Sequence, residues 1–95
     1  MSRQPSGIDE VLVAGLGSPT KLSILMLLTK SRDALTRYTI VKGTWASDRD
    51  ALRVLRALVE LGWVEEISVK PVKYRLNAEN EIVKYLVEFF SRAGV

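Results

Sequence analysis

The chain contains no cysteine and no histidine. Without cysteine it can form neither a disulfide bond nor a thiolate metal site, and it has no cysteine nucleophile. Without histidine it lacks the side chain that most often acts as a general base. It also has no glycine-rich phosphate loop and no pair of carboxylates at a spacing typical of an active site. We therefore expect neither an enzyme nor a protein that carries a metal or another cofactor.

Long apolar runs are also missing. The longest, from Ile24 to Leu28, is far shorter than the roughly 20 residues that cross a bilayer. Met1 to Gly7 has no apolar stretch behind Arg3, so it does not resemble a signal peptide. We expect a cytoplasmic protein with no membrane partner. Its 95 residues, 47% of them hydrophobic, are enough for a single globular domain over 1–95.

Positive charge is concentrated in the middle of the chain. The formal net charge is only +3, but Arg32 to Arg75 contains nine lysines and arginines against six acidic residues. From Leu76 to Val95 the counts are two and three. The middle of the chain is therefore the part best suited to bind a polyanion.

Capping residues and apolar spacing predict a series of helices. Ser18 and Pro19 are typical of a helix start, since serine caps unpaired N–H groups and proline fits the first helical position. From Leu22 to Leu28 apolar residues go nearly all the way round this helix, so we expect it to be buried on two sides. The predicted elements are helices at 6–16, 18–31, 36–43, 48–61 and 78–92, with a hairpin at 63–76.

The middle of the chain is predicted to form two helices joined by a tight turn. Thr36 can cap a short helix of two turns, and Ser47 can cap a longer helix over 48–61. Gly62 follows where a left-handed C-cap residue belongs. Trp45, in the turn, could stack on the sugar-phosphate backbone or fill the gap between the two helices, and of these we expect the second. The inner face of the longer helix is predicted to consist of Leu52, Leu55, Leu58, Val59 and Leu61.

A hairpin is predicted directly after these helices. Trp63 to Val69 and Val72 to Leu76 are rich in β-branched and aromatic residues, and Lys70 and Pro71 separate them. In the second strand we expect Val72, Tyr74 and Leu76 to face the core, and Lys73 and Arg75 to face solvent. The predicted fold is mainly α with a small β-hairpin. It is a winged helix-turn-helix, with the helix-turn-helix at 36–61 and a two-stranded antiparallel wing at 63–76.

Three stretches resemble a known superfamily. The opening helix of arsenic-repressor-type (ArsR-like) regulators is similar to LGSPTKLSILMLL. Their recognition helix and first wing strand, like those of MarR-like relatives, resemble ALRVLRALVELGWVEEI, and the second wing strand resembles KYRLN. The resemblance covers Leu16 to Asn77. It implies a homodimeric transcription regulator with its recognition helix in the major groove and its wing against the DNA backbone, although the cysteine and histidine ligands of metal-sensing members are missing.

The side chains of the 48–61 helix agree with DNA binding. An α-helix fills the major groove, and its first turns reach the base edges. Arg49 and Arg53 lie one turn apart on the outward face, where each can bind guanine, while Arg56 is placed to meet a phosphate. Thr44 and Ser47 can donate to phosphate at the helix entrance. The predicted DNA contacts are Thr44, Ser47, Arg49, Arg53, Arg56, Lys70 and Lys73, the two lysines binding the flanking backbone.

More apolar residues are present than one small domain can bury. The helices predicted at 6–16 and 78–92 each carry an apolar stripe, in addition to the two-sided helix that begins at Ser18. We therefore expect a homodimer in which these two flanking helices form most of the interface. The predicted interface residues are Leu12, Ile82, Leu86, Phe89 and Phe90. The sequence does not indicate a small-molecule effector.

A second function stays open. Asp48, Asp50, Glu65 and Glu66 fall within the same region as the predicted DNA contacts. Carboxylates repel phosphate, so this acidic quartet would weaken a DNA-binding surface but suit a basic protein. The alternative is a winged helix that serves as a protein-protein interaction module and does not read DNA.

Overall fold

The computed structural model describes residues 19–68 and 70–92, and this part of the chain is mainly helical with a small antiparallel sheet. The helix predicted at 6–16 lies outside the described residues. No helix within the described ranges is long and apolar enough to cross a membrane. In chain order the elements are α2 (Pro19–Lys30), β1 (Leu35–Thr36), α3 (Arg37–Gly43), α4 (Asp48–Glu60), β2 (Val64–Ile67), β3 (Lys73–Leu76) and α5 (Glu81–Arg92).

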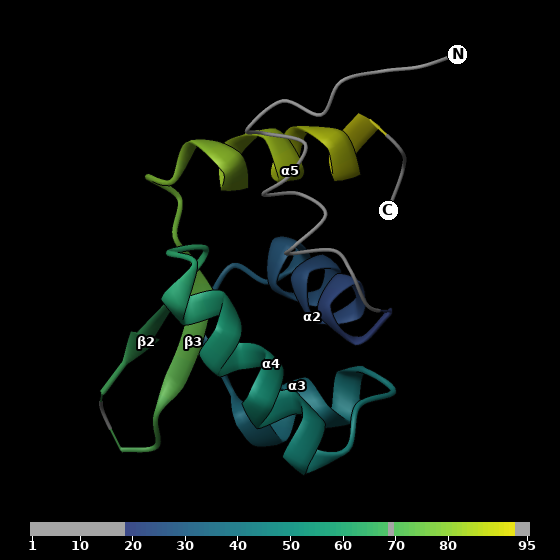
Figure 1. Cartoon of the computed structure of the whole chain (residues 1–95), viewed down its shortest axis with the longest axis vertical. Coiled ribbons are helices and arrows are strands. Elements are labelled where there is room, and N and C mark those ends of the chain that lie inside the picture. The colour runs from purple at the N-terminus through teal and green to yellow at the C-terminus, as the bar shows by residue number, and fades with distance from the viewer. Residues whose placement is uncertain (1–18, 69, 93–95) are drawn as a thin grey trace.

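Helix α2 lies in the middle of the fold and contacts α3, α4, β3 and α5 (Figure 1). Its fully buried face consists of Ile24, Leu25 and Leu28. Leu22 is exposed, and Met26 is only partly buried against the core. One side of α2 is therefore buried as predicted. The other side, which carries Leu22 and Met26, is only partly covered by the described residues.

The sheet has three strands, where the sequence predicted two. Their order is β1-β3-β2, and both pairs are antiparallel. Leu35 pairs with Tyr74 in β1 and β3, and Val64 pairs with Leu76 in β2 and β3. Because β3 is the central strand, it joins the segment before α3 to the segment after α4.

The second hairpin strand starts one residue later than predicted. Lys73 is the first residue of β3, and Val72 lies before it in the turn with 41% of its surface exposed. The prediction that Val72 faces the core is therefore wrong, because β3 begins only at the next residue and Val72 lies outside the sheet. Tyr74 is buried as predicted, and Arg75 is exposed as predicted.

Helix α4 packs on the core with a narrower face than predicted. Its buried residues are Ala51, Val54, Leu55 and Leu58. Leu52 is half-buried and Leu61 is exposed, so these two predicted core positions are wrong. The reason is geometric, since each residue turns the helix by about 100° and Leu52 thereby lies to the side of the line through Ala51 and Leu55.

The junction between α4 and α5 is held by amide side chains on one backbone carbonyl. Gly62 adopts the predicted left-handed conformation, with φ of 78°. Its carbonyl oxygen accepts hydrogen bonds from Nδ2 of Asn77 at 2.9 Å and of Asn80 at 3.2 Å. Oδ1 of Asn80 accepts from the backbone N–H groups of Ile82 and Val83. Asn80 therefore caps α5, which begins at Glu81 and not at residue 78 as predicted.

Candidate nucleic-acid interface

The outward face of α4 is charged over its whole length. Ser47 caps the helix as predicted, its Oγ accepting a hydrogen bond from the backbone N–H of Asp50 at 3.1 Å. Since the opposite face is buried, the helix cannot rotate without breaking the core, and its charged face has a fixed direction. The exposed residues on this face are Asp48, Arg49, Asp50, Arg53, Arg56 and Glu60, as the sequence predicted.

The three arginines of α4 differ in their partners. Nη2 of Arg53 lies 3.6 Å from Oδ1 of Asp50, and both side chains are more than half exposed. An exposed pair of this kind contributes about 0–1 kcal/mol, so it is easily exchanged for another partner. Arg49 and Arg56 form no ion pair with any residue that the structure describes. Their guanidinium groups are therefore ready to bind an anion or a base edge.

Three members of the acidic quartet are paired with cations. Oδ1 of Asp48 lies 3.0 Å from Nε of Arg37, a contact that joins the first turns of α3 and α4. Asp50 is paired with Arg53, and Oε2 of Glu65 accepts a hydrogen bond from Nε of Arg75 at 2.8 Å. These pairs reduce the negative charge that the quartet presents to an anion.

Glu66, the fourth member, is bound by a tyrosine. Its Oε1 accepts a hydrogen bond from the hydroxyl of Tyr74 at 3.3 Å. Burial raises the pKa of the Tyr74 phenol above its ordinary value, and the negative charge of Glu66 raises it further. The positive charges of Arg37 and Arg56 act in the opposite direction. The guanidinium of Arg56 is thus close enough to the hairpin for its charge to act there.

The two hydroxyls at the entrance of α4 are not equivalent. Oγ1 of Thr44 donates to the carbonyl of Ile40 at 2.8 Å and accepts from the N–H of Ala46 at 3.3 Å. Its hydroxyl hydrogen is therefore engaged, which leaves Thr44 poorly suited to the predicted phosphate contact. Ser47 accepts its capping bond, and its own hydroxyl hydrogen has no acceptor among the described residues.

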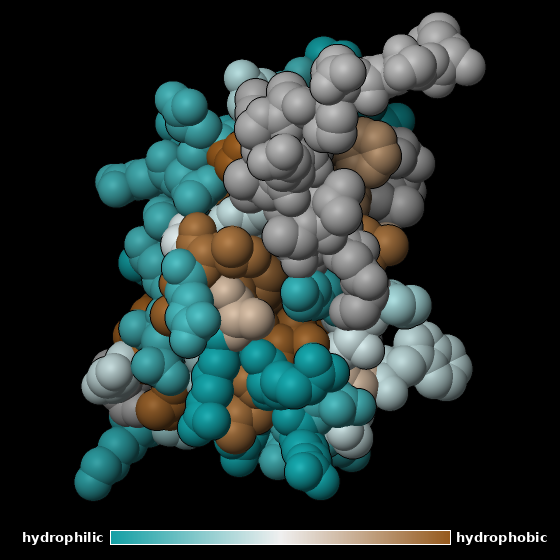
Figure 2. Space-filling view, in the orientation of Figure 1, coloured by the Kyte–Doolittle hydropathy of each residue, from teal (hydrophilic) through white to brown (hydrophobic). Residues whose placement is uncertain are grey.

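The hairpin carries two further cations beside this face. Lys70 is exposed in the turn between β2 and β3, and Lys73 is half-buried at the start of β3. Neither forms an ion pair within the described ranges. The turn of the hairpin and the first turn of α4 lie at the same end of the molecule (Figure 1). Figure 2 shows hydrophilic side chains over much of the lower half of the view, where these elements lie, with apolar side chains between them and near the middle.

Trp45 does not fill the gap between α3 and α4, and that prediction is wrong. The side chain is completely exposed, with a relative accessibility of 100%. Two residues earlier, at Gly43, an added Cβ would stand 2.9 Å from Cδ2 of Leu27 in α2. The end of α3 thus packs directly on α2, and the Trp45 ring lies at the rim of a shallow groove lined mainly by α2, outside the packed core. Sequence patterns predict that a tryptophan is buried, and they hold no signal for this close approach.

The predicted dimer residues of α5 fall into two groups. Leu86 and Phe90 are 4% and 2% exposed, because they pack in the core of the chain itself, so they are not accessible to a partner. Ile82 is partly buried against the same core. Phe89 is 62% exposed and Tyr85, which the sequence analysis did not select, is 55% exposed. Leu12 lies outside the described residues.

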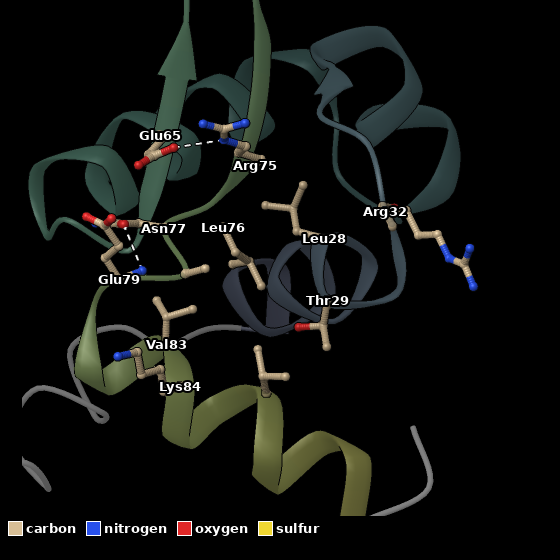
Figure 3. A pocket seen from close by; sticks show the side chains of 13 residues that line it. Leu28, Thr29, Arg32, Glu65, Arg75, Leu76, Asn77, Glu79, Val83 and Lys84 are labelled. Atoms are coloured by element: carbon tan, nitrogen blue, oxygen red, sulfur yellow. Dashed lines mark hydrogen bonds and ion pairs between the residues drawn. The ribbon is translucent and has the colours of Figure 1, made fainter.

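A cleft of about 680 Å³ lies between the end of α2, the end of β3 and the first turns of α5. Figure 3 shows Arg75 of this cleft paired with Glu65, and Oδ1 of Asn77 accepts a hydrogen bond from the backbone N–H of Glu79. Leu28, Leu76 and Val83 line the space between them. Within the part of the chain described, no three acidic, histidine or cysteine side chains are grouped to hold a metal ion.

Comparison with known proteins gives no further identification. A scan against models of protein families finds no match for the chain, and a search of curated proteins finds none either.

Proposed function

We propose that the chain is a winged-helix protein that binds double-stranded DNA, and that α4 enters the major groove. The observation that carries this proposal is the outward face of α4, where Arg49 and Arg56 are exposed and form no ion pair within the described residues. Arg49 is in the first turn, the part of such a helix that reaches base edges, and arginine binds O6 and N7 of guanine with two hydrogen bonds. Arg56, two turns further along, meets a phosphate.

The β2–β3 hairpin acts as the wing in this proposal. Lys70 and Lys73 bind the phosphates next to the major-groove site, and the hydroxyl of Ser47 donates to a phosphate at the entrance of α4. Arg53 takes part after it exchanges Asp50 for a base. Asp48 and Glu65 keep their cationic partners when Arg53 binds a base, so these two carboxylates oppose DNA less than the acidic quartet as a whole suggests. This weakens the main support for a protein-interaction module.

The test is a titration of a random-sequence duplex at several salt concentrations, followed by fluorescence anisotropy. If each protomer places three or four cations on phosphates, a dimer neutralises about 6–8 phosphates and log K falls against log salt with a slope of roughly −5 to −7. A monomer would give about half that slope. Absence of binding, or binding that does not respond to salt, would contradict the proposal and favour a protein-interaction module.

We further propose that the protein acts as a homodimer through α5. The support is the pair of exposed aromatic side chains, Tyr85 and Phe89, which lie one turn apart on a helix whose other face is the core. Replacing both by glutamate should give a monomer in light scattering that keeps the helical circular dichroism of the wild type, because neither ring is in the core. A wild-type monomer at micromolar concentration would contradict this proposal.

A further inference from the structure

Trp45 is the most exposed of the large apolar side chains among the described residues, and it lies two residues before the Ser47 cap of α4. A tryptophan offers the largest apolar area of any side chain, and most of that area is normally removed from water. The other tryptophan of the chain, Trp63, follows this rule with 1% exposure. Trp45 makes no packing contribution to the core that would explain its presence in the turn.

The surroundings of Trp45 combine apolar surface with positive charge. A shallow groove of about 370 Å³ runs beside it, formed mainly by α2 through Leu22 and Met26, and its one charged lining residue is Lys30. At the end of α3, Nζ of Lys42 lies 5.4 Å from the centroid of the Tyr38 ring, one turn back along the same helix, in a cation–π contact. No carboxylate lines this groove.

We propose that Trp45 packs its indole face against a deoxyribose of the DNA backbone, at the edge of the site that α4 occupies. This inference rests on the proposed DNA binding. A deoxyribose presents an apolar C–H face between two phosphates, and the turn presents an exposed apolar ring three residues after Lys42 and two residues before Ser47. The contact extends the proposed interface from α4 to the end of α3 and needs no rearrangement of the core.

An apolar contact with the backbone has a distinctive signature. It carries no sequence information, so loss of the ring should weaken specific and random duplexes alike. It releases no counterions, so the slope of log K against log salt should stay unchanged. Lys42→Ala should instead reduce that slope by about one per protomer. Substitution of Lys42 should thus change the salt slope, and substitution of Trp45 should not. A general loss of structure would not produce this difference.

The experiment compares Trp45→Ala, Trp45→Phe and Lys42→Ala on one specific and one random duplex, at four salt concentrations. Trp45→Ala should lose roughly tenfold in affinity on both duplexes at every salt concentration, as expected for one stacked aromatic ring. Trp45→Phe should keep most of the affinity. Leu61→Ala, which removes an exposed apolar side chain after the other end of α4, is the control and should bind both duplexes as the wild type does.

Tryptophan fluorescence gives a second measurement in the same samples. DNA should shift the emission of Trp45 to shorter wavelength and leave buried Trp63 unchanged, so the shift should vanish in Trp45→Phe. If Trp45→Ala binds both duplexes as tightly as the wild type while Arg49→Ala binds weakly, the inference is overturned and the proposed DNA binding stands. A reduced salt slope in Trp45→Ala would also overturn it. If the wild-type protein binds no duplex, the proposed function fails, and the inference fails with it.

Discussion

Arg49→Ala should reduce both affinity for a preferred duplex and discrimination against other duplexes. Because Arg49 is exposed and forms no ion pair within the described residues, the substitution breaks no contact that stabilises the folded chain. The loss measured on DNA is then the loss of the DNA contact itself. A bidentate arginine–guanine contact provides about 1–3 kcal/mol of discrimination, which corresponds to about 5- to 150-fold in the dissociation constant.

Arg53→Ala should lose less than Arg49→Ala if the two arginines read equivalent bases. Arg53 must first leave Asp50, and that exposed pair at 3.6 Å is worth about 0–1 kcal/mol. Asp50→Ala should therefore leave DNA affinity equal or raise it. Its effect on stability should be small, about 0.3–1 kcal/mol from the helix dipole, because the side chain that caps α4 belongs to Ser47.

The assay is fluorescence anisotropy with a duplex selected from a random pool and with a random duplex of equal length. Lys70→Ala is the control for general backbone binding, and it should weaken both duplexes equally and lower the salt slope by about one per protomer. If Arg49→Ala and Lys70→Ala change the two duplexes in the same way, α4 does not read base edges and its assignment as the recognition helix is refuted.

Three further substitutions test the framework of the site. Ser47→Ala should lower the free energy of unfolding by about 0.5–2 kcal/mol in a urea titration, because it removes the cap of α4. Gly62→Ala should cost about 1–2 kcal/mol in the same titration, since φ of 78° is unfavourable for a side chain with a Cβ; an unchanged midpoint would contradict the left-handed cap. The pKa of the Tyr74 phenol is raised above its ordinary value of 10.0, so the unfolded chain loses this proton at a lower pH than the folded chain does. The free energy of unfolding should therefore fall as the pH rises through 10.0. Tyr74→Phe should make this fall smaller.

The helices of the site could be predicted from the sequence because their signals are local. Thr36 and Ser47 act as N-caps, each accepting a hydrogen bond from the N–H three residues later, and Gly62 has the expected left-handed backbone. The outward positions of α4 follow from a helical period of 3.6 residues once its start is known. The outward direction of Arg49 and Arg53 is therefore determined by the sequence of α4 and its cap alone, a stretch of about fifteen residues.

The features that could not be predicted depend on residues far apart in the chain. Strand β1 is two residues long, too short for any periodicity, and it exists because Leu35 pairs with Tyr74. The exposure of Trp45 depends on how the turn between α3 and α4 is placed beside α2. The burial of Leu86 and Phe90 within the chain, and not between two copies, depends on where α5 packs. In each case the hydrophobic pattern specifies that a residue is apolar but not which surface covers it.

The pairing of β1 with β3 has a consequence for how the parts of the site move. Thr36 caps α3, and in the sheet it stands opposite Lys73. A force on the hairpin is thus transmitted through two backbone pairings to the first turn of the helix that precedes α4. We expect the amide hydrogens of β1, β3 and α3 to exchange with solvent as one cooperative unit, with a single opening free energy. A ligand that immobilises the hairpin would then slow exchange in α3 as well, without touching it.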